Sequence, residues 1–170
     1  MRFFALALAI ALLAGCATPY QKQGLMGGFE ETQLAPNVWR VSFKGNGYTS
    51  TERVEDLVLL RSAELTLQSG FTHFGLAASR VGASQSAYTT PVTTTTTANV
   101  TAYGNSAYGT ANSYSSGGNT YFVSKPSANN VVVMFKGQPD AAGMVFDARF
   151  ICNSVGPKYK ATCAADPAHT

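Results

Sequence analysis

Charge is the scarcest property of this chain. Asp, Glu, Lys and Arg together make up 12% of its 170 residues, against about 25% in average soluble domains. The formal net charge is +3, and no run of basic residues appears along the sequence. So weak a positive balance lacks the electrostatic footprint on which nucleic-acid binding depends. We therefore expect no nucleic-acid partner.

Metal ligands and catalytic motifs are scarce as well. The chain has two histidines, His73 and His169, and three cysteines, whereas a zinc site needs four ligands. No Gly-x-Ser-x-Gly motif supplies a nucleophile, and nothing in the sequence pairs His73 with one. We predict no metal site, no cofactor and no catalytic residue.

The sequence also has no apolar run that could span a bilayer. The longest run covers residues 3–14, whereas a membrane-spanning helix needs about 20 residues. It follows Arg2 and ends in Ala14-Gly15 just before Cys16. This layout is typical of a bacterial lipoprotein signal peptide. We predict that residues 1–15 are removed and that Cys16 becomes the lipid-bearing first residue. An ordinary secretory signal with a chance cysteine is the alternative.

Lipidation determines where the protein would reside. Each buried methylene contributes about 0.8 kcal/mol, so the several acyl chains of a lipobox cysteine hold firmly where one chain is marginal. Residue 17 is alanine, whereas an aspartate there resembles the inner-membrane retention signal of many Gram-negative lipoproteins. We expect an outer-membrane protein that faces the periplasm and contacts the membrane through the lipid on Cys16.

Two cysteines remain once Cys16 carries lipid. Cys152 and Cys163 lie eleven positions apart, and the periplasm is an oxidising compartment. We predict a disulfide between them, with two free thiols as the alternative.

Hydrophobic patterning predicts one α+β domain over 27–160, after a lipidated tether at 16–26 and before a tail at 161–170. In the segment 38–43, alternation places Trp39, Val41 and Phe43 on one face, as in a half-buried strand. We expect a four- to five-stranded antiparallel or mixed sheet with two helices on one face. The predicted strands are 29–34 at an edge, 38–43, 71–77, 120–123 and a central strand at 131–135.

Two segments have the marks of helices. Thr49 and Glu52 have the spacing of a capping box, and Gly70 is placed to end the first helix in the left-handed conformation. The second helix is predicted over 140–155, where Gly156-Pro157 ends it.

A long insertion at 82–119 separates the predicted strands. No charged residue occurs from Val81 to Ser124, and threonine fills positions 93–97. Such low-complexity sequence has too few large aliphatic residues to form its own core. Because Thr and Tyr favour strands, we expect either a flexible segment or a protruding β-ribbon.

The charged residues of the helices fit ion pairs better than catalysis. Glu64 and Asp147 lie on apolar segments, and each has an arginine within reach, Arg61 and Arg149. An active-site carboxylate is the less favoured interpretation.

The glycine-containing segment 44–48 before the first helix resembles an anion-binding turn, but a plain change of chain direction explains it better.

Several stretches of the sequence look familiar when they are taken together. The lipobox at Cys16 is followed by Glu-Thr-Gln-Leu-Ala-Pro at 31–36, by Val-Ser-Phe-Lys-Gly-Asn-Gly-Tyr-Thr-Ser at 41–50, by Leu-Leu-Arg-Ser-Ala-Glu-Leu at 59–65 and by Gly-Phe at 70–71. This combination resembles a group of small uncharacterised bacterial lipoproteins. The resemblance implies a location in the cell envelope and no established activity, and it supplies no catalytic residue.

Three functions remain as hypotheses. The first is a non-enzymatic structural or adaptor protein that contacts another envelope protein or peptidoglycan. The second is a small envelope hydrolase that uses Glu64 or Asp147 with His73. The third is a ligand- or glycan-binding protein that uses the tyrosine-rich insertion.

Overall fold

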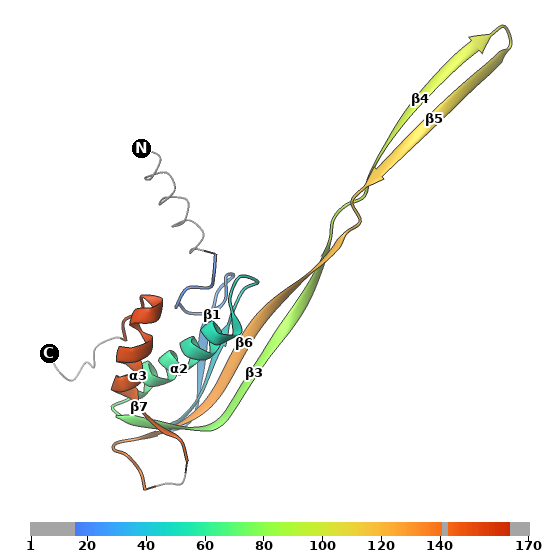
Figure 1. Cartoon of the computed structure of the whole chain (residues 1–170). Coiled ribbons are helices and arrows are strands. Elements are labelled where there is room, and N and C mark those ends of the chain that lie inside the picture. The colour runs from blue at the N-terminus through green and yellow to red at the C-terminus, as the bar shows by residue number, and fades with distance from the viewer. Residues whose placement is uncertain (1–15, 141–142, 164–170) are drawn as a thin grey trace, which may run out of the picture. The chain divides into compact units, whose positions relative to one another are not determined.

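A computed structural model describes residues 16–140 and 143–163 of the chain. The predicted signal peptide at 1–15 and the end of the predicted tail at 164–170 lie outside the described residues. The chain forms two compact units, one of residues up to 84 and from 124 onward, the other of residues 85–123. Each unit is described separately below (Figure 1).

The first unit is built on a five-stranded antiparallel sheet of the order β1-β2-β6-β3-β7. The apolar segment 131–135 lies in the central strand β6, and the segment 29–34 lies in the edge strand β1, as predicted. The strands are β1 (Gly28–Ala35), β2 (Val38–Lys44), β3 (His73–Thr89), β6 (Thr120–Phe135) and β7 (Val145–Asp147).

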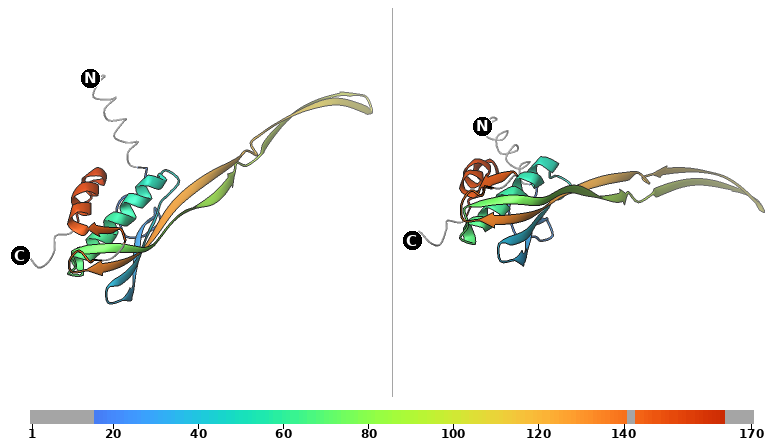
Figure 2. Two further views of the ribbon diagram at one scale, coloured as in Figure 1. Left: turned by 60° about the horizontal axis from the view of Figure 1, so that its bottom comes forward. Right: turned by 90° about the horizontal axis from the view of Figure 1, so that it is seen from below.

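Two helices cover one face of this sheet, which confirms the α+β prediction (Figure 2). Helix α2 (Thr51–Gln68) packs on the sheet, and α3 (Ala148–Val155) packs against α2. A single 3₁₀ turn, η1 (Pro157–Tyr159), follows α3. No described helix combines the length and the apolar character that are needed to cross a membrane.

The core lies between α2 and the sheet. Val41 and Phe43 of β2 are fully buried and Trp39 is half-buried, so the predicted core face of this strand is confirmed. The large apolar side chains that are fully buried are Val41, Phe43, Val54, Leu57, Val58, Leu60, Phe74, Val132 and Met134.

Helix α2 begins one residue later than the capping box predicts. Its N-cap is Ser50, whose hydroxyl accepts a hydrogen bond from the Arg53 amide at 3.2 Å. The Thr49 hydroxyl is not available for capping because it is bonded to Thr18. Gly70 has φ of +75°, so the predicted left-handed end of this helix is confirmed.

The second helix is shorter than the predicted 140–155. Residues Val145–Asp147 form strand β7, which pairs with β3, and α3 begins only at Ala148. The Asp147 carboxylate caps α3 by accepting a hydrogen bond from the Phe150 amide at 2.9 Å. An aspartate that can bond nearby amides favours a helix start over a helix interior. Phe146 meanwhile stacks on Phe74, with ring centroids 5.3 Å apart.

Cys152 and Cys163 form the predicted disulfide, with their Cα atoms 5.8 Å apart. The bond joins α3 to the segment after η1, where Ala161 and Cys163 pack against the core. The domain therefore continues past the predicted boundary at 160, as far as Cys163. Closing a loop of this length stabilises a fold by roughly 3 kcal/mol in the chain-entropy treatment.

The second unit contains a two-stranded antiparallel ribbon of β4 (Thr93–Tyr103) and β5 (Ser106–Ser116). Every residue of both strands is exposed. Gly104, at the first turn position, has φ of +57°, which suits the two-residue type II′ turn common in hairpins. Of the two expectations for the insertion, the structure has the β-ribbon.

Candidate functional site

The predicted lipidation residue lies at the start of the described chain. Cys16 is exposed and forms no disulfide. The side-chain amide of Asn46 donates a hydrogen bond to the Cys16 carbonyl at 2.8 Å. The backbone that would bear the lipid is therefore fixed to the loop between β2 and α2.

Thr18, two residues further on, is the centre of this attachment and is fully buried. Its amide donates to the Thr49 hydroxyl at 3.0 Å, and its hydroxyl donates to the Met26 carbonyl at 2.7 Å. The Asn46 amide donates to the Thr18 hydroxyl at 2.9 Å, and the Arg53 side chain donates to the Thr18 carbonyl at 3.1 Å. These bonds satisfy the main-chain polar groups that burial would otherwise leave costly.

The segment predicted as a tether at 16–26 is therefore largely part of the folded domain. Its amides and carbonyls also pair with Phe29 at the start of β1. Only Ala17 lies between Cys16 and the fully buried Thr18. The loop 44–48, interpreted from sequence as a chain turn, binds this N-terminal segment. No sequence pattern marked Thr18, Asn46 or Thr49 as partners.

Apolar and basic side chains lie on the segments that hold the N-terminal backbone. Leu25, Met26 and Tyr48 are exposed, and hydrogen bonds tie the backbone of two of them to the same cluster: the Met26 carbonyl to Thr18, and the Tyr48 amide to Asn46. Leu25 also lines an open pocket of about 320 Å³ together with Lys44 and Lys125. This surface offers both apolar contact and positive charge.

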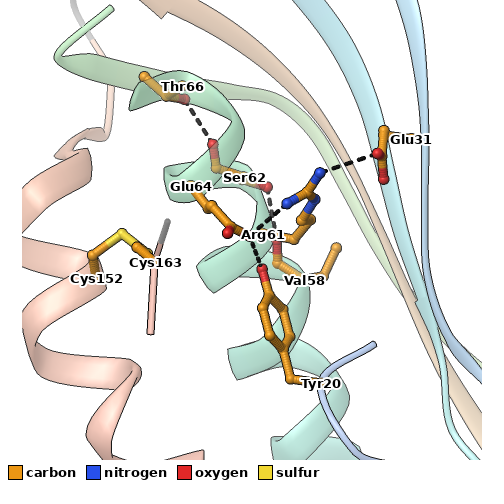
Figure 3. Close-up of polar contacts among 9 residues, drawn as sticks. All are labelled: Tyr20, Glu31, Val58, Arg61, Ser62, Glu64, Thr66, Cys152 and Cys163. Atoms are coloured by element: carbon orange, nitrogen blue, oxygen red, sulfur yellow. Dashed lines mark hydrogen bonds and ion pairs between the residues drawn. A yellow bond between two sulfur atoms is a disulfide. The ribbon is translucent and has the colours of Figure 1, made fainter. Parts of the chain in front are cut away.

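A second polar cluster lies under the N-terminal segment (Figure 3). Arg61 of α2 binds Glu64 at 2.5 Å and Glu31 of β1 at 3.1 Å, and its own side chain is 10% exposed. The predicted pair of Glu64 with Arg61 is thus present. Tyr20 donates its hydroxyl hydrogen to Glu64, and the Arg61 guanidinium lies 4.4 Å from the centre of the Phe29 ring. The cluster joins the N-terminal segment, β1 and α2.

The polar residues next to this cluster are satisfied within α2. The Ser62 hydroxyl donates to the Val58 carbonyl at 2.8 Å, and the Thr66 hydroxyl donates to the Ser62 carbonyl at 2.7 Å. Bonds of this kind, to a carbonyl four residues earlier, let hydroxyl groups face a core without unpaired donors. Figure 3 shows this series along one side of the helix.

The pKa of the Tyr20 phenol is raised by its burial and, next, by its hydrogen bond to Glu64. The fold thus favours the neutral phenol, so this contribution to stability is complete below the unfolded pKa of about 10. It is lost as the pH rises above that value, because only the unfolded chain then ionises freely. We expect the free energy of unfolding to fall above about pH 10.

Replacing Tyr20 with phenylalanine should remove part of this alkaline slope. Urea unfolding at neutral pH and at about pH 11 measures it, with Tyr48→Phe as the control because Tyr48 is exposed. The Tyr20→Phe variant keeps the part of the loss that comes from Tyr159 and Lys158, whose pKa values are also raised. Equal slopes for Tyr20→Phe and wild type would contradict the role of the buried phenol.

The hydrolase hypothesis pairs His73 with either Glu64 or Asp147, and the structure brings Asp147 near His73 but places Glu64 in another cluster. Glu64 is bound to Arg61 and Tyr20, whereas Asp147 lies near His73, with 3.9 Å between the carboxylate and the ring. That separation is beyond hydrogen-bond range. The neighbouring Thr72 hydroxyl bonds the other ring nitrogen at 2.8 Å. The separation between Asp147 and His73 is thus longer than the hydrogen bond between base and carboxylate in a catalytic triad. Within the described chain, no three His, Cys, Asp or Glu residues are placed to hold a metal ion.

The ribbon has two chemically different faces. Its register runs without a bulge from Thr93↔Ser116 to Tyr103↔Ser106, so alternate residues share a face. One face carries Tyr103, Tyr108 and Tyr114, with Thr and Asn between them. The other face carries Thr94, Thr96, Ser113 and Ser115, followed towards the turn by Ala98, Val100, Ala102, Ala107, Gly109 and Ala111.

Comparisons with family models, with curated proteins and with solved structures found no match to this chain.

Proposed function

We propose that this protein is a lipid-anchored lipoprotein of the outer membrane that faces the periplasm and has a structural or adaptor role without catalysis. The ribbon of β4 and β5 is the element that contacts another envelope component, a protein or peptidoglycan. The observation that carries the proposal is the ribbon itself, whose strands are fully exposed and free of charged residues.

The residues that follow Cys16 and those that bind them support the proposed lipid anchor. The cysteine is exposed, and Asn46 and Thr18 hold the following backbone on the domain. Exposed Leu25 and Met26 with nearby Lys44 suit a surface that lies against lipid, because apolar side chains enter the interface and cations attract anionic headgroups.

The ribbon of β4 and β5 supports the proposed adaptor role. Long connections within compact domains are uncommon and usually serve a function. The strands bury none of their residues, so the ribbon adds little apolar burial to the stability of its own chain. Tyrosines on one face provide large contact area together with a hydroxyl group, a combination enriched at binding surfaces.

Replacing Cys16 with serine tests the anchor. We expect the full-length protein to lose all incorporation of radiolabelled palmitate and to leave the outer-membrane fraction, as unprocessed precursor or as soluble protein. Ala17→Ser, which alters the adjacent residue but keeps the thiol, should behave as wild type. Unlabelled wild-type protein that fractionates like Cys16→Ser would refute the lipid anchor.

Shortening the insertion tests the adaptor role. A chain in which 85–123 is replaced by a short glycine-containing turn should keep its melting temperature and its lipid. In the full chain, photoreactive residues placed at Tyr103, Tyr108 or Tyr114 should form in-cell crosslinks. Crosslinks to an envelope protein or to muropeptides identify the partner class, and no crosslink at any of the three positions counts against the role.

A further inference from the structure

The two strands of the ribbon each have one unpaired edge. The sheet of β4 and β5 contains no third strand. Tyr103↔Ser106 closes a two-residue turn, so the odd-numbered residues of β4 form the hydrogen-bonded pairs with β5. The amides and carbonyls of Thr94, Thr96, Ala98, Val100 and Ala102 consequently point to the free edge.

These edges lack the features that keep strands apart. Natural edge strands are short, or carry charged side chains, proline or bulges that prevent pairing. Both β4 and β5 span eleven residues, with no charge, no proline and no bulge in their register. An edge of this kind is a template for another strand.

Of the two edges, that of β4 is the better suited to pairing. It holds the threonine run from Thr93 to Thr97 and also Val100, and β-branched residues have the highest strand preference. The β5 strand contains Gly109, Asn112 and four serines, which are weak strand formers. Threonines placed opposite each other also interact favourably across strands.

A second copy of β4 is the occupant that this chemistry fits. The strand has no charge with which to select a differently charged partner or to repel an identical one. When two β4 strands pair antiparallel over their whole length, Thr95 faces Thr101 and Thr96 faces Val100, so β-branched residues meet on both faces. If Cys16 carries lipid, as the proposed function requires, the copies share one membrane surface and their encounters become more frequent.

We propose that two copies of this protein join through their β4 edges into a four-stranded antiparallel sheet of the order β5-β4-β4-β5. Pairing over the whole strand requires a twofold axis at Ala98, the middle residue of Thr93–Tyr103. Ala98 then faces its own copy, and Thr96 faces Val100 of the second copy. All of these residues point their amides to the free edge, as the pairing requires. The inference names the partner of the proposed adaptor element and rests on that proposal.

The test is oxidative crosslinking of full-length protein in cells, with two differently tagged copies expressed together. Ala98→Cys should yield a reducible dimer that contains both tags. Ala111→Cys is the matched control, because Ala111 is the register partner of Ala98 and is equally exposed. In the proposed sheet the two Ala111 residues lie about 14 Å apart, three strand spacings, so this variant should form no dimer.

A proline variant separates edge pairing from chance collision. Thr96→Pro removes an outward amide and the side-chain bond to Ser113 but leaves the backbone bonds between β4 and β5 in place, which an edge strand tolerates. Added to Ala98→Cys, it should abolish the dimer while the monomer persists at an equal level. Equal dimer from Ala98→Cys and Ala111→Cys, or no dimer from Ala98→Cys, would overturn the inference. Photocrosslinks to another envelope component without the dimer would overturn it too, yet leave the proposed function standing.

Discussion

Replacing Arg61 with alanine should destabilise the domain by about 3–5 kcal/mol, the usual cost of removing one partner from a buried ion pair. The guanidinium is 10% exposed and bonds two carboxylates, Glu31 and Glu64, whose side chains are 18% and 8% exposed. Without Arg61 these carboxylates must remain close together in a poorly solvated space. The loss of the contact between Arg61 and the Phe29 ring adds to the cost.

Urea unfolding at neutral pH, followed by circular dichroism, measures this effect. Arg40→Ala is the matched control, because Arg40 lies on the exposed face of β2 and should change stability by no more than about 0.5 kcal/mol. Arg61→Ala combined with Glu64→Gln should recover part of the loss, since one of the two carboxylate charges is removed. An Arg61→Ala domain as stable as the Arg40→Ala domain would show that solvent reaches this cluster freely.

The cluster shows what the sequence could and could not predict. Arg61 and Glu64 are three residues apart on one helix, so their pairing follows from helical geometry. Glu31 and Tyr20 reach the same arginine from β1 and from the N-terminal segment. Only the packing of α2 against these segments brings them together. Glu64, an alternative catalytic residue from sequence, is bound within this cluster instead.

Secondary structure was predictable wherever the chain had a clear period. The alternation at Val41 and Phe43 identified the core face of β2, and the apolar run at 131–135 identified the central strand. The second helix was predicted too long because 145–151 contains apolar residues that fit either period. Asp147 caps α3, so the helix begins only after it. Val145 and Phe146 instead pair with β3 as part of a strand.

The N-terminal segment is the part that composition misrepresented. Pro19, Gly24 and polar neighbours are typical of a linker. Thr18 is nevertheless fully buried, and both its amide and its hydroxyl are hydrogen-bonded. Three of the residues that bond Thr18, namely Asn46, Thr49 and Arg53, lie 28 to 35 positions away, which no local pattern reveals. The disulfide was predictable from the cysteine count alone, because setting Cys16 aside left Cys152 and Cys163 as the one possible pair.

Replacing Gly27 with alanine tests how tightly this segment is held. Gly27 has φ of +91°, and a Cβ there would lie 2.2 Å from the Lys44 carbonyl oxygen and 3.1 Å from the Thr18 methyl. The left-handed conformation and the overlap with backbone each cost about 1–3 kcal/mol. We expect a loss of about 3 kcal/mol or more in unfolding free energy, together with faster proteolysis at 16–26.

Two other glycines separate the contributions to this loss. Gly70 is left-handed with open space around its Cβ position, so Gly70→Ala should show the conformational cost alone, about 1–2 kcal/mol. Gly24 has neither a left-handed φ nor a neighbour within 4 Å, so Gly24→Ala should change little. If Gly27→Ala costs no more than Gly70→Ala, the Lys44 backbone gives way easily and the segment is loosely held. A larger cost for Gly27→Ala than for Gly70→Ala would mean that the Lys44 backbone does not give way and that the segment after Cys16 is held firmly on the domain.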